Sequence, residues 1–121
     1  MAERLGKLID IFSLVERNLK LRHWITKSHA EHETTEYIVN NLRPLFDKFV
    51  EEAIGSGYAD TIKLPSKFLE PTIELDLTDF LQQFSEFMQN NEKVAEMTMN
   101  SATIDDIVDT INVGIYKLSQ N

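Results

Sequence analysis

The sequence contains no cysteine, and this absence removes a whole group of possible sites. Without thiols the chain cannot build a disulfide framework, an iron–sulfur cluster, a thiolate zinc site or a cysteine nucleophile. Any metal must therefore be held by nitrogen and oxygen ligands. No apolar run approaches the ~18 residues of a membrane span, and the N-terminus lacks the charged-then-apolar pattern of a secretion signal. We therefore expect a cytoplasmic protein with no membrane partner.

Positive charge is also scarce. The 121 residues include 12 lysines and arginines against 20 aspartates and glutamates, so the net charge is −8 and the pI is near 4.8. An acidic surface repels the phosphate backbone, and we expect no nucleic-acid partner. A chain of this length can bury roughly two thirds of its unfolded surface in one core. We therefore predict a single domain that covers residues 1–121.

Apolar residues recur at intervals of three and four along most of the chain, which is typical of amphipathic helices. The pattern predicts four helices, at about residues 3–26, 29–55, 77–98 and 103–119. The core positions expected in the first helix are Leu5, Leu8, Phe12, Val15 and Leu19. Those expected in the second helix are Ala30, Tyr37, Ile38, Leu42, Leu45, Phe49 and Ile54.

The connections between these helices predict how they are arranged. Ser28 and Glu31 form a capping-box pattern at the start of the second helix, and the tight turn near Lys27 makes the first two helices antiparallel neighbours. Between residues 56 and 76 the helical period disappears and prolines interrupt the chain, which indicates a long crossover. The expected fold class is all-α: a ferritin-like four-helix bundle with a long crossover between the second and third helices.

Histidines and carboxylates on the first two helices are candidate metal ligands. The sequence has no Glu-x-x-His motif, which the usual di-iron bundle carries on each of two helices, so a standard centre inside the bundle is disfavoured. His23 and His32 flank the turn between the helices and can approach each other. Asp47 lies fifteen residues after His32, about 22 Å along a continuous helix, and cannot share its ion. Glu51, one turn further, shares a face with Asp47.

Two copies of the chain can together form a metal site that one copy alone cannot complete. Antiparallel packing around a twofold axis brings the histidines of one chain to the carboxylates of the other, and creates two equivalent metal sites. The segment Leu19-Lys20-Leu21-Arg22-His23-Trp24, followed by His32, Asp47 and Glu51 at the spacings given above, resembles the Dps family of mini-ferritins. In this chain the two histidines are about three residues closer together than is usual in that family.

The resemblance implies an iron-handling protein with a site shared between the subunits of a homodimer or larger homo-oligomer. His23, His32, Asp47 and Glu51 would bind Fe(II), or zinc or manganese, and the implied activity is that of a ferroxidase. His29 is an alternative ligand if the short turn shifts the register. A second interpretation is a non-catalytic dimeric binding or scaffold protein of phage or viral origin, with the loop from residue 56 to residue 71 as its contact surface.

Overall fold

The computed structural model describes residues 4–58, 75–97 and 101–120, and all the regular structure in these ranges is helical. The elements are α1 (Arg4–Ile25), α2 (His29–Ala53), the π-helix η1 (Ile54–Tyr58), α3 (Leu77–Asn90), α4 (Glu92–Ala95) and α5 (Ala102–Ser119). The expected all-α class is therefore confirmed. Most of the expected crossover, residues 59–74, lies outside the described residues.

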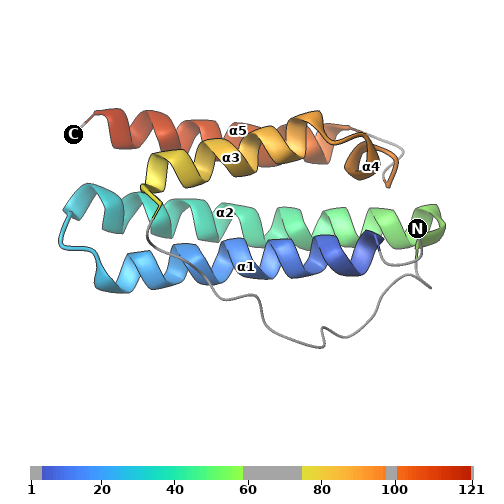
Figure 1. Cartoon of the computed structure of the whole chain (residues 1–121), viewed down its shortest axis with the longest axis horizontal. Coiled ribbons are helices and arrows are strands. Elements are labelled where there is room, and N and C mark those ends of the chain that lie inside the picture. Colours follow the sequence, from blue (N-terminus) through green and yellow to red (C-terminus); the bar gives the residue numbers. More distant parts are fainter. Residues whose placement is uncertain (1–3, 59–74, 98–100, 121) are drawn as a thin grey trace.

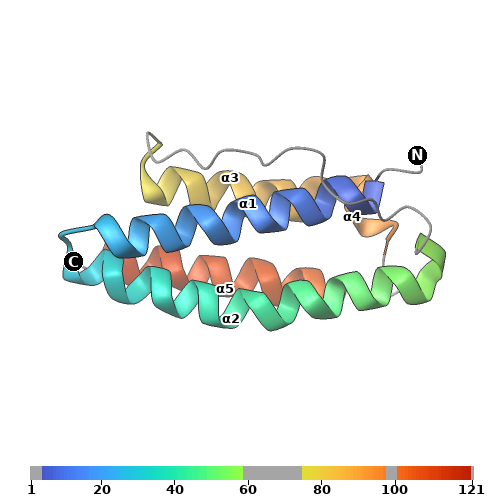
Figure 2. The same cartoon turned by 90° about the horizontal axis from the view of Figure 1, so that it is seen from below.

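The helices pack in two layers, with α1 beside α2 in one layer and α3 beside α5 in the other (Figure 1). Contacts join α1 to α2, α2 to α5 and α3 to α5. The chain reverses between α1 and α2, which are antiparallel. In contrast, α2 and α3 run in the same direction, so η1 and the start of α3 lie at opposite ends of the bundle (Figure 2).

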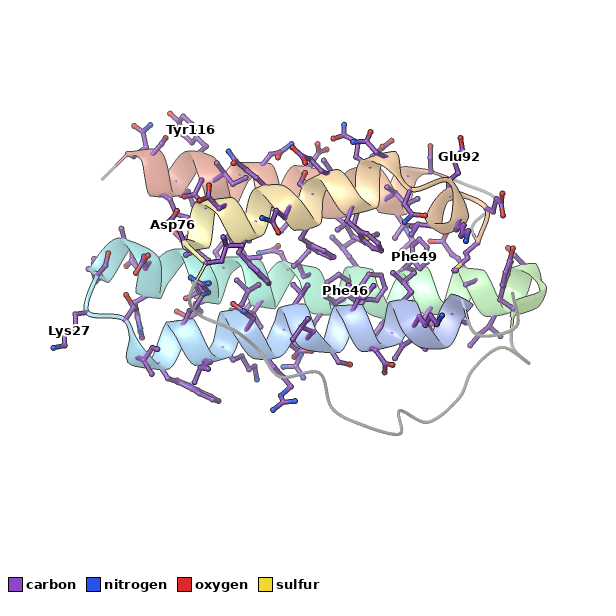
Figure 3. The ribbon with its side chains drawn as sticks, in the orientation of Figure 1. Lys27, Phe46, Phe49, Asp76, Glu92 and Tyr116 are labelled. Atoms are coloured by element: carbon purple, nitrogen blue, oxygen red, sulfur yellow. The ribbon has the colours of Figure 1, made fainter. Side chains whose placement is uncertain are left out.

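The core lies between the two layers. All five core positions expected in the first helix are buried, with at most 4% of each residue exposed. Phe12 stacks on Phe46 of α2 with the ring centroids 4.1 Å apart, and Phe49 and Phe84 meet Phe12 edge-on. Figure 3 shows Phe46 and Phe49 reaching from α2 into the space between the layers. In the second helix the register differs in part from the expected one, since Phe46 is buried whereas Ile54 is 40% exposed.

Side-chain caps set most of the helix ends. Ser28 accepts a hydrogen bond from the backbone N–H of Glu31 at the start of α2, as the sequence predicted, and Asp76 caps α3 in the same way through Thr78. At its other end α2 continues into η1. Gly57, the residue before the end of η1, has a φ of 99°, which lies in the left-handed region that favours glycine.

The third predicted helix, at residues 77–98, is wrong at its C-terminal end. α3 stops at Asn90, because Asn91 adopts an extended conformation with φ −96° and ψ 109°. The Asn91 side chain accepts hydrogen bonds from the backbone N–H groups of Lys93 at 3.0 Å and Val94 at 3.2 Å, and so starts the short helix α4. An asparagine side chain can hydrogen-bond to nearby backbone groups in a non-helical conformation. At Asn91 these bonds end α3 and begin α4.

Candidate metal centre

His23 and His32 lie face to face where α1 ends and α2 begins. Their ring centroids are 3.8 Å apart and the ring planes differ by 20°. Nδ1 of His23 lies 2.8 Å from the backbone oxygen of His32, and Nδ1 of His32 lies 2.9 Å from the backbone oxygen of His23. The short turn therefore does bring these two histidines together, as the sequence predicted.

This reciprocal pair of hydrogen bonds determines which nitrogen of each imidazole ring carries the hydrogen. A carbonyl oxygen only accepts, so each Nδ1 must carry the hydrogen and donate it. In the neutral imidazole the lone pair then resides on Nε2, which is the form that binds a metal ion. Hydrogen bonding of one ring nitrogen to a backbone carbonyl is also the usual way in which a metal-binding histidine is oriented.

Further polar groups hold the turn and the His23 ring. The Thr35 hydroxyl donates to the backbone oxygen of Glu31 at 2.7 Å, and its oxygen lies 3.2 Å from Nδ1 of His23. The Glu31 carboxylate accepts a hydrogen bond from the Thr26 hydroxyl at 2.6 Å, whose oxygen in turn accepts from the N–H of Ser28 at 3.1 Å. These bonds link the end of α1 to the first turn of α2, and so stabilise the turn that carries the two imidazole rings.

Arg22, the residue before His23, ties the same end of α1 to the start of α3. Its Nε donates to Asn18 Oδ1 at 2.6 Å, a terminal nitrogen donates to the backbone oxygen of Leu75, and the guanidinium lies 5.5 Å from the Phe80 ring centroid. Burial lowers the pKa of Arg22, and the negative charges of Glu31 and Asp76 partly oppose this shift. This role was not predictable from the sequence, because an arginine near a helix C-terminus is more often solvated.

The two carboxylates lie further along α2. Asp47 and Glu51 are exposed, and the helix is continuous from His29 to Ala53. Fifteen residues of helix separate His32 from Asp47 by about 22 Å, so the two side chains of one chain cannot contact the same ion. In the described part of the chain, no group of three or more histidines and carboxylates is arranged to hold a metal ion.

His29 does not join the histidine pair. Its Nε2 lies 3.1 Å from the Glu33 carboxylate, one turn along α2, and both side chains are largely exposed. The structure thus brings His32, and not His29, to His23.

Comparison with known proteins places the chain in a family. The model of a family of unknown function, DUF5856, matches residues 23–118. The chain belongs to this family. It is also 33% identical over 99 residues, 80% of this chain and 73% of the other, to an "Uncharacterized 14.6 kDa protein in mobD-ri intergenic region" of Enterobacteria phage T4. No solved structure matches the chain.

The DUF5856 match begins at His23 and ends within α5. It therefore includes all four predicted ligands, both the histidine pair and the two carboxylates, and leaves out most of α1. None of the described helices is long and apolar enough to cross a membrane.

Proposed function

We propose that the protein is a ferritin-like metal-binding protein, whose site is completed when two copies associate. The observation that carries the proposal is the reciprocal hydrogen bonding of His23 and His32, which leaves Nε2 of each neutral ring available to a metal ion. A stacked pair held in this way is preorganised, since little side-chain freedom remains to be lost when the ion binds.

Ligand number is the reason for proposing two copies. Two imidazoles alone make a weak site, and the carboxylates that would complete it lie about 22 Å away on the same helix. A second chain packed antiparallel across a twofold axis would place its Asp47 and Glu51 beside the histidines of the first. Mixed imidazole and carboxylate ligands suit Fe(II), zinc and manganese.

The course of the helices supports the ferritin-like part of the proposal. α1 and α2 are antiparallel, α2 and α3 run in the same direction, and η1 ends at the opposite end of the bundle from the start of α3 (Figure 2). A connection that returns along the length of the bundle is the long crossover of ferritin-like folds.

With iron as the substrate, the site would support ferroxidase chemistry. Two Fe(II) ions would each give one electron to hydrogen peroxide, which takes up two protons and leaves as two molecules of water. The protein would hold Fe(II) through the imidazoles and carboxylates, and would leave open coordination positions for the oxidant. The negative net charge would draw cations towards the surface.

Metal binding by single variants tests the proposal. We expect His32→Ala and Asp47→Ala each to lower the affinity for Fe(II) or zinc by at least about 100-fold, since even the loss of a residue that only orients a ligand costs 10–100-fold. Matched controls are His29→Ala, an exposed histidine three residues from His32, and Asp109→Ala, an exposed aspartate on α5. Metal content and Fe(II) oxidation are measured for all four. Unchanged binding in both site variants would refute the proposal.

A non-catalytic dimeric binding or scaffold protein is the second candidate. The observation in its favour is the apolar surface at the end of α1, where 71% of Trp24 and 51% of Ile25 are exposed. Of the loop expected to make the contact, only residues 56–58 belong to the described part of the chain. No Fe(II) oxidation above background, together with unchanged dimerisation of the His32 variant, would favour this candidate.

A further inference from the structure

Two hollows lie between α1 and α2, one near each end of this helix pair. The first, near the turn, has a volume of about 190 Å³ and is lined by Lys20, His23, Trp24, Thr35, Glu36, Val39 and Asn40. The second, towards the other end, has a volume of about 210 Å³ and is lined by Ile9, Phe12, Glu16, Arg43, Phe46, Asp47 and Val50. Both sets recur at intervals of three and four on each helix, so they lie along one seam.

The first hollow bears an aromatic side chain that the chain itself leaves uncovered. Trp24 is 71% exposed, and Ile25 beside it is 51% exposed. An indole that is left in water forgoes the burial of about 150–250 Å² of mostly apolar surface. Tryptophan is also the residue most enriched among those that dominate binding energy at interfaces.

The second hollow is suited to bind such a side chain. Its floor consists of the stacked rings of Phe12 and Phe46, whose centroids are 4.1 Å apart. Its rim is polar, with the exposed carboxylate of Asp47 and the Glu16–Arg43 ion pair of 2.8 Å. An apolar floor with a carboxylate at the rim suits an indole, whose body is apolar and whose N–H needs an acceptor.

We propose that the occupant of this hollow is Trp24 of a second copy of the chain, and that each copy of an antiparallel dimer inserts its Trp24 over Phe12 and Phe46 of the other. The inference rests on the proposed function, because it specifies the contact that would bring Asp47 of one copy to His23 of the other. His23 and Trp24 are neighbours in one hollow, and Asp47 forms the rim of the other.

The register and the charges agree with this pairing. Trp24 and Phe12 are twelve residues apart on α1, about 18 Å, so a twofold axis that crosses α1 near residue 18 exchanges them. Lys20 lines the hollow that holds Trp24, and Lys27 extends from the turn (Figure 3). In this register Lys20 would lie opposite the partner's Glu16 and Lys27 opposite the partner's Glu51, so the charges of the two copies are complementary.

The single tryptophan of the chain allows a direct test. The native protein is diluted in the presence of a chelator, and its mass and its tryptophan emission are followed together. We expect a dimer at high concentration whose Trp24 emission is shifted to shorter wavelength and is protected from acrylamide, and both signals are lost together on dilution. A chain that stays monomeric, or a dimer whose Trp24 remains fully quenchable, would overturn the inference.

Variants test the same contact by mass alone. Removing one dominant interface residue weakens binding by about 30-fold, so Trp24→Ala, which removes two indoles per dimer, should raise the dissociation constant by about 1,000-fold. Tyr116→Ala is the matched control, because Tyr116 is 63% exposed but points away from the bundle on α5 (Figure 3). Lys27→Glu and Glu51→Lys should each weaken the dimer, and the double variant should recover most of the loss.

These outcomes separate the inference from the proposed function. A metal-free dimer that buries Trp24 but binds no metal would uphold the contact and refute the metal site. A chain that binds metal tightly while its Trp24→Ala variant dimerises as the native protein does would overturn the contact and leave the metal site standing. Retained dimerisation in both Trp24→Ala and Lys27→Glu would likewise overturn the contact.

Discussion

Replacing Gly114 by alanine probes the contact between α2 and α5. Gly114 is buried on α5, where a Cβ atom would lie 2.4 Å from Cδ1 and 2.8 Å from Cγ1 of Ile38. Ile38 is fully buried in α2, so its side chain has little room to move away. Thr34, one turn earlier on α2, would be only 3.6 Å from the new methyl group, at ordinary contact distance. The glycine therefore serves close helix packing and no special backbone conformation.

Two opposing effects set the magnitude for Gly114→Ala. Alanine stabilises a helix interior by about 1 kcal/mol relative to glycine. Overpacking of a core by one methyl group costs about 1–3 kcal/mol. Because two atoms of Ile38 would lie under 3 Å from the new Cβ, we expect the packing cost to prevail. The free energy of unfolding should fall by about 1 kcal/mol, seen in urea as a lower midpoint with an unchanged slope.

A double-mutant cycle with Ile38→Val identifies the clash as the cause. Valine lacks Cδ1, the atom that would lie closest to the new methyl group. Ile38→Val alone should cost about 0.5–1.5 kcal/mol, but together with Gly114→Ala the loss should be about 1 kcal/mol smaller than the sum of the two. Gly55→Ala is the control, since a Cβ at Gly55 would meet nothing within 4 Å. A Gly114→Ala protein as stable as the native one would refute the packing argument.

Two further predictions concern the segment that carries the histidines, both measured by urea unfolding. Ser28→Ala removes the cap of α2 and should lower the free energy of unfolding by about 1 kcal/mol, whereas Lys27→Ala next to it, on an exposed residue, should change it by less than about 0.5 kcal/mol; equal effects would contradict the capping role. Arg22→Met keeps an apolar stem against Phe80 but removes the donor to the buried side-chain oxygen of Asn18 and to the partly buried backbone oxygen of Leu75. We expect a loss of about 1–3 kcal/mol, and a change below about 0.5 kcal/mol would show that the guanidinium does not hold α3.

The first helix was predictable because nothing in its sequence competes with the apolar stripe. Its five expected core residues recur at regular intervals, and all of them are buried. In the second helix the register was less certain from sequence, since Leu45 and Phe46 are adjacent and either can face the core. The structure selects Phe46, whose ring stacks on Phe12 of α1. That choice depends on a side chain more than thirty residues away, which periodicity within one helix does not contain.

The histidine pair was predictable in part. Its two members flank a short turn, and a turn of that length brings them together whatever its detailed path. The hydrogen bonds from each Nδ1 to the backbone oxygen of the other residue depend on that path, and no spacing rule reveals them. The burial of Arg22 could not be predicted either, because its partners Leu75, just before α3, and Phe80, on α3, lie more than fifty residues later in the sequence.

The stiffness of α2 links metal binding to assembly. A continuous helix fixes His32 and Asp47 about 22 Å apart, so no rearrangement of side chains lets one chain chelate an ion with both. If the proposed site exists, the ion contacts two chains. Metal binding then stabilises the dimer relative to the monomer, and dimerisation strengthens metal binding by the same free energy. The backbone already orients the histidine pair, so little of the binding free energy would be lost in ordering these two side chains. Most of it would strengthen the association of the two chains.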